Sequence, residues 1–538
     1  MLAVLSGVLQ IVIFPLPSLY MLSWVAVIPL LVAVLHAREA DTLQLSNSPG
    51  LKLVPANFGQ GFLLGYLSGI IWYAGTCYWV YDTMHQYGGL SAAAAFGVLI
   101  LFCLYLALYH GAFGALLTLA ADPGSSLSRR ALLTAPFLWV AVELARTRIT
   151  GFPWDLLGTV QVDNIPLARI ARFTAVYGLS FEIMLVNTAF AAAFLVRRDK
   201  RKTLLIAGFC AAVALQAGRW IAPPSPLSDH TAYLVQQNIP ILDSSGWTKD
   251  YFEGTLRDLL WISEKPISEG AQKPDLMVWP ESPAPFYTSD PLFRDAISNL
   301  ARQTHTWVLT GSIRVRNAIQ IPEQGTAAYN SAALVGPDGE WVAHYDKVHL
   351  VPFGEYLPFK KVFSFAGGLT KEVGDFQHGA SRAPLQADGQ KLGVFICYES
   401  VFPDEVRQFA KNGAQVLVNI SNDGWYGESG AYAQHLMQSR MRAVENDRWL
   451  LLDTNTGVTA SVDPYGRIEK SLPRKIRATL RAPYALTNVT TFYTRHGDWF
   501  AYLCAIISLS ALLTRFLFHT KQGHDGRGTR TGIHSTER

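Results

Sequence analysis

The stretch GVFICYES occupies residues 393–400 of the chain. Its first half is apolar and ends on Cys397, and the polar residues Tyr398, Glu399 and Ser400 follow at once. A short apolar run that stops at polar groups is typical of a buried strand that ends at the edge of a sheet. A Cys in such a place is more often a small core residue than a nucleophile. Its role therefore depends on what the rest of the sequence places beside it.

Similar β-rich runs recur between residues 222 and 498, and helical patterns separate several of them. Strands that alternate with helices favour an α/β domain. The turn residues at 463–466 (DPYG) predict a hairpin. The expected strands are 232–236, 276–279, 307–313, 331–335, 392–396, 416–420 and 450–453, and the expected helices are 249–263, 291–303, 403–412 and 431–447.

The composition indicates a membrane protein with a substantial polar part. Half of the 538 residues are hydrophobic and only 16% are charged, whereas a soluble domain carries about 25% charged residues. The net charge of +4 is small for this length, and no basic block indicates a nucleic-acid partner. Four of the five cysteines lie in apolar stretches, and no Cys/His spacing indicates a metal site. We expect neither a metal nor a cofactor.

Apolar windows of about 20 residues, the length that crosses a bilayer, recur along the chain. The candidate spans are 2–18, 19–36, 58–82, 90–119, 131–147, 170–196, 203–221 and 499–518. The basic residues of the short loops fall almost entirely on one side if both termini are cytoplasmic, although Arg148 and Arg169 break the pattern. This topology places the large polar segment outside the cytoplasm.

The sequence therefore predicts about eight spans around one α/β domain. The expected parts are transmembrane helices in residues 1–221, an extracytoplasmic catalytic domain in 222–498, a terminal span in 499–518 and a disordered cytoplasmic tail in 519–538.

Three stretches of the α/β domain end an apolar run on an ionisable or reactive side chain. LMVWPES leads to Glu281, HYDKVHLVPFGEYLPF contains Lys347 and Glu355, and GVFICYES leads to Cys397. A Cys nucleophile needs a base that takes its proton and a cation that stabilises the thiolate. One Glu, one Lys and one Cys at strand ends would meet at one sheet edge, where active sites of α/β folds gather. Taken singly, Glu281 reads equally as a turn residue and Lys347 as a solvated charge.

The motifs WPES, YDKVHLVPFGEYLP and CYES together resemble the Glu-Lys-Cys motifs of the nitrilase superfamily. With the predicted spans and the stretch GFPWDLLG at 151–158, the chain is similar to the apolipoprotein N-acyltransferase family of bacterial membrane enzymes. The resemblance implies a four-layer αββα sandwich on a multi-pass membrane bundle. It also implies an acyl chain that moves from a phospholipid to a Cys thioester, and then to the α-amino group of an S-diacylglyceryl-cysteine apolipoprotein. We expect a monomer in the bacterial inner membrane.

The resemblance also implies a role for each motif residue. Cys397 is the expected nucleophile, Glu281 the base, and Lys347 the oxyanion stabiliser together with the backbone N–H of Tyr398. Three supporting residues are expected around them: Glu355, Tyr398 and Glu399. For the last two, polar residues of a turn at a strand end are the less favoured alternative. An aromatic near the substrate, Trp247, and an amide, Asn330, are weaker candidates, because a packing Trp and a capping Asn fit the same patterns.

The stretch LPFKKVFSFAGGL, Leu357–Leu369, is apolar, carries two lysines and ends in a Gly pair. This composition fits a lid that dips into the membrane interface, with Phe363 and Phe365 as lipid contacts, and it fits an ordinary core-packing loop equally well. Two other functions stay open at this stage. One is a membrane-tethered amidase or nitrilase with the same triad, and the other is a transporter or sensor with an inactive domain.

Overall fold

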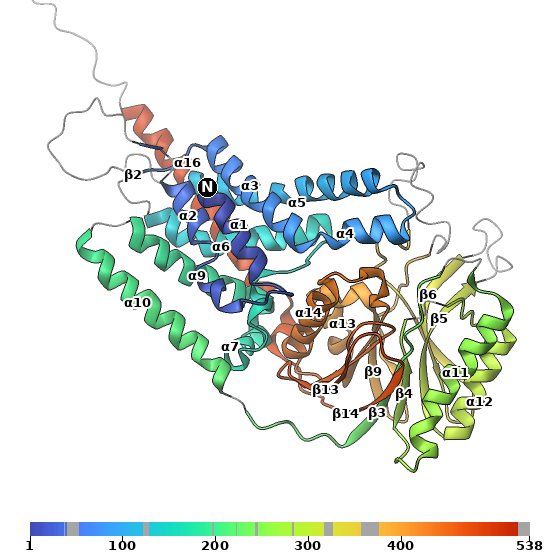
Figure 1. Cartoon of the computed structure of the whole chain (residues 1–538). Helices are drawn as coiled ribbons and strands as arrows, with labels where there is room; N and C mark the ends of the chain where they lie inside the picture. Colours follow the sequence, from blue (N-terminus) through green and yellow to red (C-terminus); the bar gives the residue numbers. More distant parts are fainter. Residues whose placement is uncertain are drawn as a thin grey trace, which may run out of the picture.

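The computed structural model describes residues 1–36, 38–39, 53–121, 129–195, 198–221, 223–242, 246–281, 284–316, 327–356 and 376–525. Figure 1 shows two parts that lie against each other: a bundle of helices and a domain that contains the sheets. The first part of the chain and the last helix form the bundle, and the segment between them forms the second domain.

The bundle consists of eight principal helices within the described residues: α1 (Leu2–Val12), α2 (Ile28–Leu35), α3 (Phe58–Thr76), α5 (Ala92–Ala120), α6 (Arg129–Ala145), α9 (Val176–Leu195), α10 (Arg198–Ala217) and α16 (Trp499–Asp525). Three stretches are long and apolar enough to cross a membrane: Ala92–Ala120, Val176–Leu195 and Lys200–Trp220. The shorter apolar stretches are Leu2–Val12, Tyr20–Leu35 and Trp499–Thr514.

The described residues therefore supply three helices of membrane-spanning length, and the count of about eight spans stays a prediction. The first predicted span, 2–18, is a helix only as far as Val12, because the prolines at 15 and 17 cannot continue a helical hydrogen-bond ladder. The predicted span 58–82 divides into α3 and the short helix α4 (Trp79–Asp82). At the other end, α16 continues to Asp525, so the first residues of the predicted tail are helical, and 526–538 lie outside the described residues.

Glycines let α3 and α5 approach closely. A Cβ on Gly65 would lie 2.1 Å from the carbonyl oxygen of His110, and a Cβ on Gly114 would lie 2.1 Å from the carbonyl oxygen of Gly61. Such small-residue contacts let two helix backbones touch where lipid supplies no hydrophobic driving force. The pair α3 and α5 is therefore fixed by backbone contact.

The second domain is built on two six-stranded sheets. The first sheet has the order β14-β3-β4-β5-β6-β7, and the second has the order β13-β12-β11-β10-β9-β8. The strands of the first are β3 (His230–Gln236), β4 (Leu276–Trp279), β5 (Trp307–Arg316), β6 (Ala327–Val335), β7 (Trp341–Asp346) and β14 (Ala478–Tyr484). Those of the second are β8 (Leu385–Ala387), β9 (Gln390–Ile396), β10 (Val416–Ser421), β11 (Leu450–Thr454), β12 (Thr459–Val462) and β13 (Ile468–Leu472).

Each sheet has a parallel centre: β3, β4 and β5 in the first and β9, β10 and β11 in the second. The outer pairs are antiparallel in both sheets. Parallel neighbours end at the same sheet edge, so the residues that follow β4, β9 and β10 are brought to one side of the domain.

The two sheets stack face to face, with helices on both outer faces. Alternate residues of β3 show this, because Leu234 packs in a core shared with the second sheet, while Tyr233 and Val235 pack against α11 (Lys249–Ser268) and α12 (Pro291–Thr304). The second sheet is covered by α13 (Pro403–Lys411) and α14 (Ala431–Asn446), which face the bundle in Figure 1. The layers follow the predicted αββα order.

Most strands and helices of this domain confirm the sequence predictions to within a few residues, including the hairpin of β12 and β13. Three strands were not predicted: β7, β8 and β14. All three are edge strands, in which polar residues interrupt the apolar run that marks a buried strand.

Candidate active site

The three predicted catalytic side chains follow three different strands. Glu281 lies two positions after β4, Lys347 directly follows β7, and Cys397 directly follows β9. Glu281 and Lys347 come from the first sheet and Cys397 from the second. All three are buried, with exposed fractions of 6%, 1% and 6%. The site therefore lies between the two sheets.

Lys347 is the cation at the centre of the site. Its Nζ lies 2.9 Å from Glu355 Oε1 and 3.3 Å from Glu281 Oε1. Burial alone would lower the pKa of Lys347, but the two carboxylates raise it above its usual value. Lys347 is therefore a charged ammonium group that two glutamates share.

Asn330, on β6, joins the same two carboxylates. Its Nδ2 donates to Glu281 Oε1 at 2.7 Å and to Glu355 Oε1 at 2.6 Å. Its backbone carbonyl accepts the N–H of Lys347 at 2.8 Å. The structure thus brings this weakly predicted residue into direct contact with the predicted base and fixes the position of the cation through it.

The other oxygen of Glu281 is held by a second-sheet residue that the sequence analysis did not single out. Glu281 Oε2 accepts the backbone N–H of Asn422 at 2.9 Å, just past the end of β10. Glu355 is also anchored at both oxygens, because its Oε2 accepts the N–H of Val351 at 2.7 Å. Each carboxylate therefore has one oxygen directed at the Lys347–Asn330 pair.

Cys397 has an unusual backbone conformation. Its φ is +50°, in the left-handed region that side-chain-bearing residues seldom adopt. This turn ends β9 and begins the 3₁₀ helix η9 (Cys397–Val401). Burial and then the charge of Glu281 raise the pKa of the Cys397 thiol, while Lys347 lowers it. The thiol is therefore protonated at neutral pH and lies within electrostatic reach of both a base and a cation.

Glu399 holds the loop of Lys347 against the turn of Cys397. One of its oxygens accepts hydrogen bonds from the hydroxyl of Tyr345 and from the backbone N–H groups of Val348 and His349, at 2.7–2.9 Å. Its other oxygen accepts the N–H of Ile396 at 2.7 Å. Burial raises the pKa of Glu399 to about 7, against the lowering effect of these donors. Glu399 therefore ties the two sheets together beside the triad.

Tyr398 points the other way, toward the bundle. Its hydroxyl donates to the carbonyl of Gly151 at 3.2 Å, and its ring stacks on Trp154 with centroids 6.4 Å apart. Both partners belong to the GFPWDLLG stretch at 151–158. The residue that follows Cys397 is thus in contact with the helical part of the molecule.

The structure gives packing contacts for one of the remaining predicted residues, and the other two lie outside the described residues. Trp247 is half-buried, and its ring contacts are with Tyr251 and Phe252 near the start of α11. These contacts match the packing alternative. Phe363 and Phe365 lie outside the described residues, as does the whole predicted lid.

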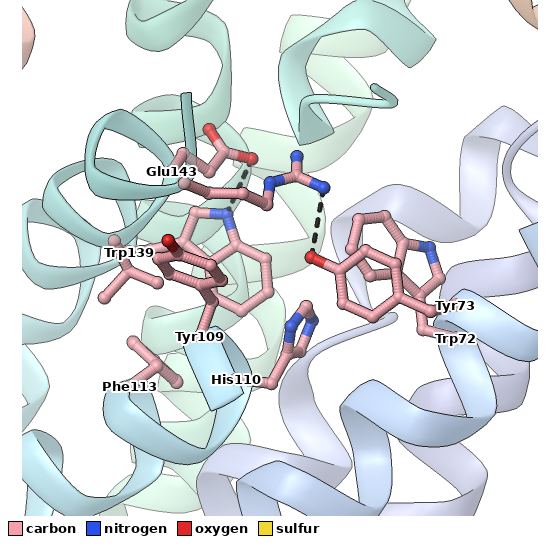
Figure 2. Close-up of a pocket in the computed structure, with 9 residues that line it drawn as sticks. Trp72, Tyr73, Tyr109, His110, Phe113, Trp139 and Glu143 are labelled. Atoms are coloured by element: carbon pink, nitrogen blue, oxygen red, sulfur yellow. Dashed lines mark hydrogen bonds between the residues drawn. The ribbon is translucent and has the colours of Figure 1, made fainter. Parts of the chain in front are cut away.

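A small cavity in the bundle is shown in Figure 2. It has a volume of about 20 Å³, enough for roughly one water molecule. Arg146 donates to the hydroxyl of Tyr73 at 3.1 Å and lies over the ring of Trp72. Within the described part of the chain, Arg146 Nη2 and Glu143 Oε2 have no hydrogen-bond partner.

Two family models match the chain. Residues 6–189 match the apolipoprotein N-acyltransferase N-terminal domain, and residues 232–492 match the carbon-nitrogen hydrolase domain. The first covers much of the bundle and the second covers the sandwich with Glu281, Lys347 and Cys397.

Individual proteins match over most of their length. An apolipoprotein N-acyltransferase of Geobacter metallireducens is 35% identical over 534 residues, which cover 97% of this chain and 96% of the relative. One from Nitrosomonas europaea is 33% identical over 85% of this chain and 89% of its own. Among solved structures, an amidase from Nesterenkonia sp. covers 52% of this chain and 98% of that one, at 19% identity and a TM-score of 0.36.

Proposed function

The chain belongs to the apolipoprotein N-acyltransferase family, and from this premise we propose that it transfers a fatty acyl chain from a membrane phospholipid to an apolipoprotein. The acceptor is the α-amino group of an S-diacylglyceryl-cysteine at the apolipoprotein N-terminus. The observation that carries the proposal is the convergence of Glu281, Lys347 and Cys397, each past the end of its strand, between the two sheets.

In the first half-reaction, Glu281 takes the proton of the Cys397 thiol, and the thiolate attacks the ester carbonyl of the phospholipid. The oxyanion that forms is stabilised by the ammonium group of Lys347 and by the backbone N–H of Tyr398. When the ester C–O bond breaks, the lysophospholipid alkoxide takes the proton from Glu281. The enzyme is left with an acyl thioester on Cys397.

In the second half-reaction, the neutral α-amino group of the acceptor attacks the thioester. Glu281 takes a proton from this nitrogen as the new C–N bond forms. The C–S bond breaks, and the Cys397 thiolate receives the proton from Glu281. The products are an amide on the apolipoprotein and the free enzyme.

Both glutamates bind Lys347 and Asn330, and their other contacts support separate roles. Glu281 lies farther from Lys347, at 3.3 Å, is also bonded to the backbone of Asn422, and its charge acts on the thiol. Glu355 is bonded to Lys347, to Asn330 and to the backbone of Val351. We therefore assign proton transfer to Glu281 and the positioning of Lys347 to Glu355.

We also propose that the protein is a monomer of the bacterial inner membrane that crosses it about eight times, with the sandwich on the extracytoplasmic side. The long apolar helices of the bundle support membrane insertion. The contact of Tyr398 with the 151–158 stretch supports a catalytic domain that rests on the bundle. A donor and an acceptor that are both lipids require a site at the bilayer.

The thioester is tested with purified full-length protein in liposomes that contain an acyl-labelled phospholipid and no acceptor. Wild type should acquire a hydroxylamine-sensitive label, and Cys397→Ala should not. Cys210→Ala is the matched control, because this exposed cysteine lies on α10, and it should label as wild type. Label on the Cys397→Ala protein would remove that residue from the mechanism.

A diacylated lipopeptide, added next, should discharge the label onto its amine as an amide. Release of the label as free fatty acid in the presence of the lipopeptide would instead favour a hydrolase.

A further inference from the structure

A second set of buried polar side chains lies behind the nucleophile, and the reaction above does not use it. Asp423 follows β10 by two positions, and His435 lies on α14. Their exposed fractions are 1% and 0%. Asp423 adjoins Asn422, whose backbone binds the proposed base, and His435 contacts the main chain of the nucleophile. The residues just after β10 therefore contact both the proposed base, through Asn422, and His435, through Asp423.

Both ring nitrogens of His435 face oxygen atoms. Nε2 lies 3.2 Å from the carbonyl oxygen of Cys397 and 2.7 Å from Ser400 Oγ, and Nδ1 lies 3.1 Å from Asp423 Oδ1. A backbone carbonyl and a carboxylate only accept hydrogen bonds. Ser400 Oγ can accept or donate, so it fits either protonation state. Nδ1 and Asp423 Oδ1 lie at ion-pair distance without the alignment of a hydrogen bond, so this buried contact is most favourable when the imidazole is charged.

Asp423 connects this histidine to the thiol. Its Oδ1 also accepts the hydroxyl of Ser421 at 2.7 Å. Ser421 lowers the pKa of the Cys397 thiol, while the charge of Asp423 raises it. An uncompensated carboxylate at this place would oppose the formation of the thiolate.

The cation of the site, Lys347, is paired with Glu281 and Glu355. The groups that act most strongly on His435 are acidic or neutral. They are Asp423 after β10, Glu281 after β4 and the Cys397 thiol after β9, and the rings of Trp154 and Tyr426 cover the imidazole. Burial acts to lower the pKa of His435, but the carboxylate of Asp423 and the Cys397 carbonyl raise it above its usual value. The surroundings thus agree with the hydrogen-bond geometry.

We propose that His435 is a positioning residue held as an imidazolium, which fixes the main chain of Cys397 and neutralises Asp423 beneath the thiol. It contacts no reacting atom, and it acts through the backbone carbonyl of the nucleophile and through Asp423. The inference deepens the proposed function and rests on the role that this function gives to Cys397.

The test measures the rate at which iodoacetamide alkylates Cys397 in the full-length protein across a pH series, with the label located by peptide mass spectrometry. No lipid and no turnover are involved, so the result is independent of the thioester experiment. Failure of thioester formation with a normal alkylation profile would count against the proposed function alone.

His435→Gln removes the positive charge and leaves Asp423 unpaired. The midpoint of the alkylation profile should rise by about one pH unit, the effect of a close like charge. Asp423→Asn removes the carboxylate, and the buried imidazole then loses its proton, so the net charge near the thiol is unchanged and the midpoint should stay at the wild-type value. The double variant should also return toward wild type.

A neutral His435 gives the opposite pattern. Asp423→Asn would then remove an uncompensated negative charge and lower the midpoint, and His435→Gln would leave it unchanged. Either result overturns the proposal. If His435→Gln does not fold, as judged by thermal unfolding in detergent, Asp423→Asn decides alone: an unchanged midpoint supports the imidazolium, and a shift in either direction contradicts it.

Discussion

At the scale of one residue, Lys347 is a buried charge that two glutamates hold in place. Its ammonium group is 1% exposed and lies within 3.3 Å of an oxygen of each of two glutamates. A buried ion pair adds little net stability, but the removal of one partner leaves a charge unpaired. Here two carboxylates would be left facing each other around Asn330.

Lys347→Met should abolish the thioester and lower the free energy of unfolding by about 3–5 kcal/mol. Lys347→Met combined with Glu355→Gln should recover part of the stability, because one of the two unpaired carboxylates is gone, but none of the activity. Thermal unfolding in detergent and acyl-labelling measure the two effects. Recovered labelling in the double variant would show that the cation is not required.

Glu399 supplies a pH dependence of stability. Burial raises its pKa from 4.5 to about 7, so between these values the folded protein binds a proton that the unfolded chain has released. The stabilisation is fully present below pH 4.5 and is lost as the pH rises to about 7. It amounts to about 3 kcal/mol for a shift of this size.

Glu399→Gln should remove this slope, because an amide does not titrate. It should also lower the overall stability, because an amide N–H would face the N–H of Ile396 or of Val348. Unfolding midpoints of wild type and variant across the acid range give both results. An unchanged slope in the variant would assign the pH dependence to another group.

The sequence indicated the proposed catalytic residues and left their hydrogen bonds undetermined. Glu281, Lys347 and Cys397 stand directly after or close to apolar runs, and this is visible along the chain. The hydrogen bonds of Asn422 and His435 are not visible along the chain. Their partners are distant in sequence and are brought near by the fold of the domain. The sequence feature that indicated this region was the run SNDGWYGES at 421–429, which begins at the last residue of β10 and places several polar side chains at its end.

At the scale of elements, the crossing of the short helix η4 (Leu157–Gln161) over α9 is the tightest point of the GFPWDLLG stretch. A Cβ on Gly158 would lie 2.4 Å from the carbonyl oxygen of Val176 and 2.7 Å from Leu179 Cβ. The N–H of Gly158 donates to Ser180 Oγ at 2.9 Å, so the crossing cannot open without loss of this hydrogen bond.

Gly158→Ala should therefore lower the free energy of unfolding by about 1–3 kcal/mol through overpacking. Gly254→Ala is the matched control, since it lies on α11 with no atom within 4 Å of the added Cβ, and a helical Ala is favoured over Gly. It should leave stability unchanged or raise it slightly. Equal unfolding midpoints for the two variants would mean that the crossing relaxes without cost.

The predicted strands and helices were accurate where apolar periodicity was strong. They missed three edge strands, β7, β8 and β14, in which polar or exposed residues interrupt the apolar run. In the bundle, composition predicted apolar windows, but the positions at which helices break depend on prolines and on packing, which a hydropathy window does not detect. The break between α3 and α4 is one example.

At the scale of the whole molecule, the proposed topology puts the sandwich and the loop at the start of α10 on opposite sides of the membrane. Lys411 is exposed at the end of α13, and Lys202 is exposed on α10. In a Cys210→Ala background, a membrane-impermeant maleimide should label Lys411→Cys in spheroplasts and label Lys202→Cys only after lysis. The reverse pattern would invert the topology.

Strand β14 has a consequence for biosynthesis. The first sheet contains Glu281 and Lys347, yet it ends with a strand that the ribosome delivers after the entire second sheet, because β14 pairs with β3. The first sheet is therefore completed only after every strand of the second has been synthesised. Because the proposed active site lies between the two sheets, its final surroundings form late in the synthesis of the chain.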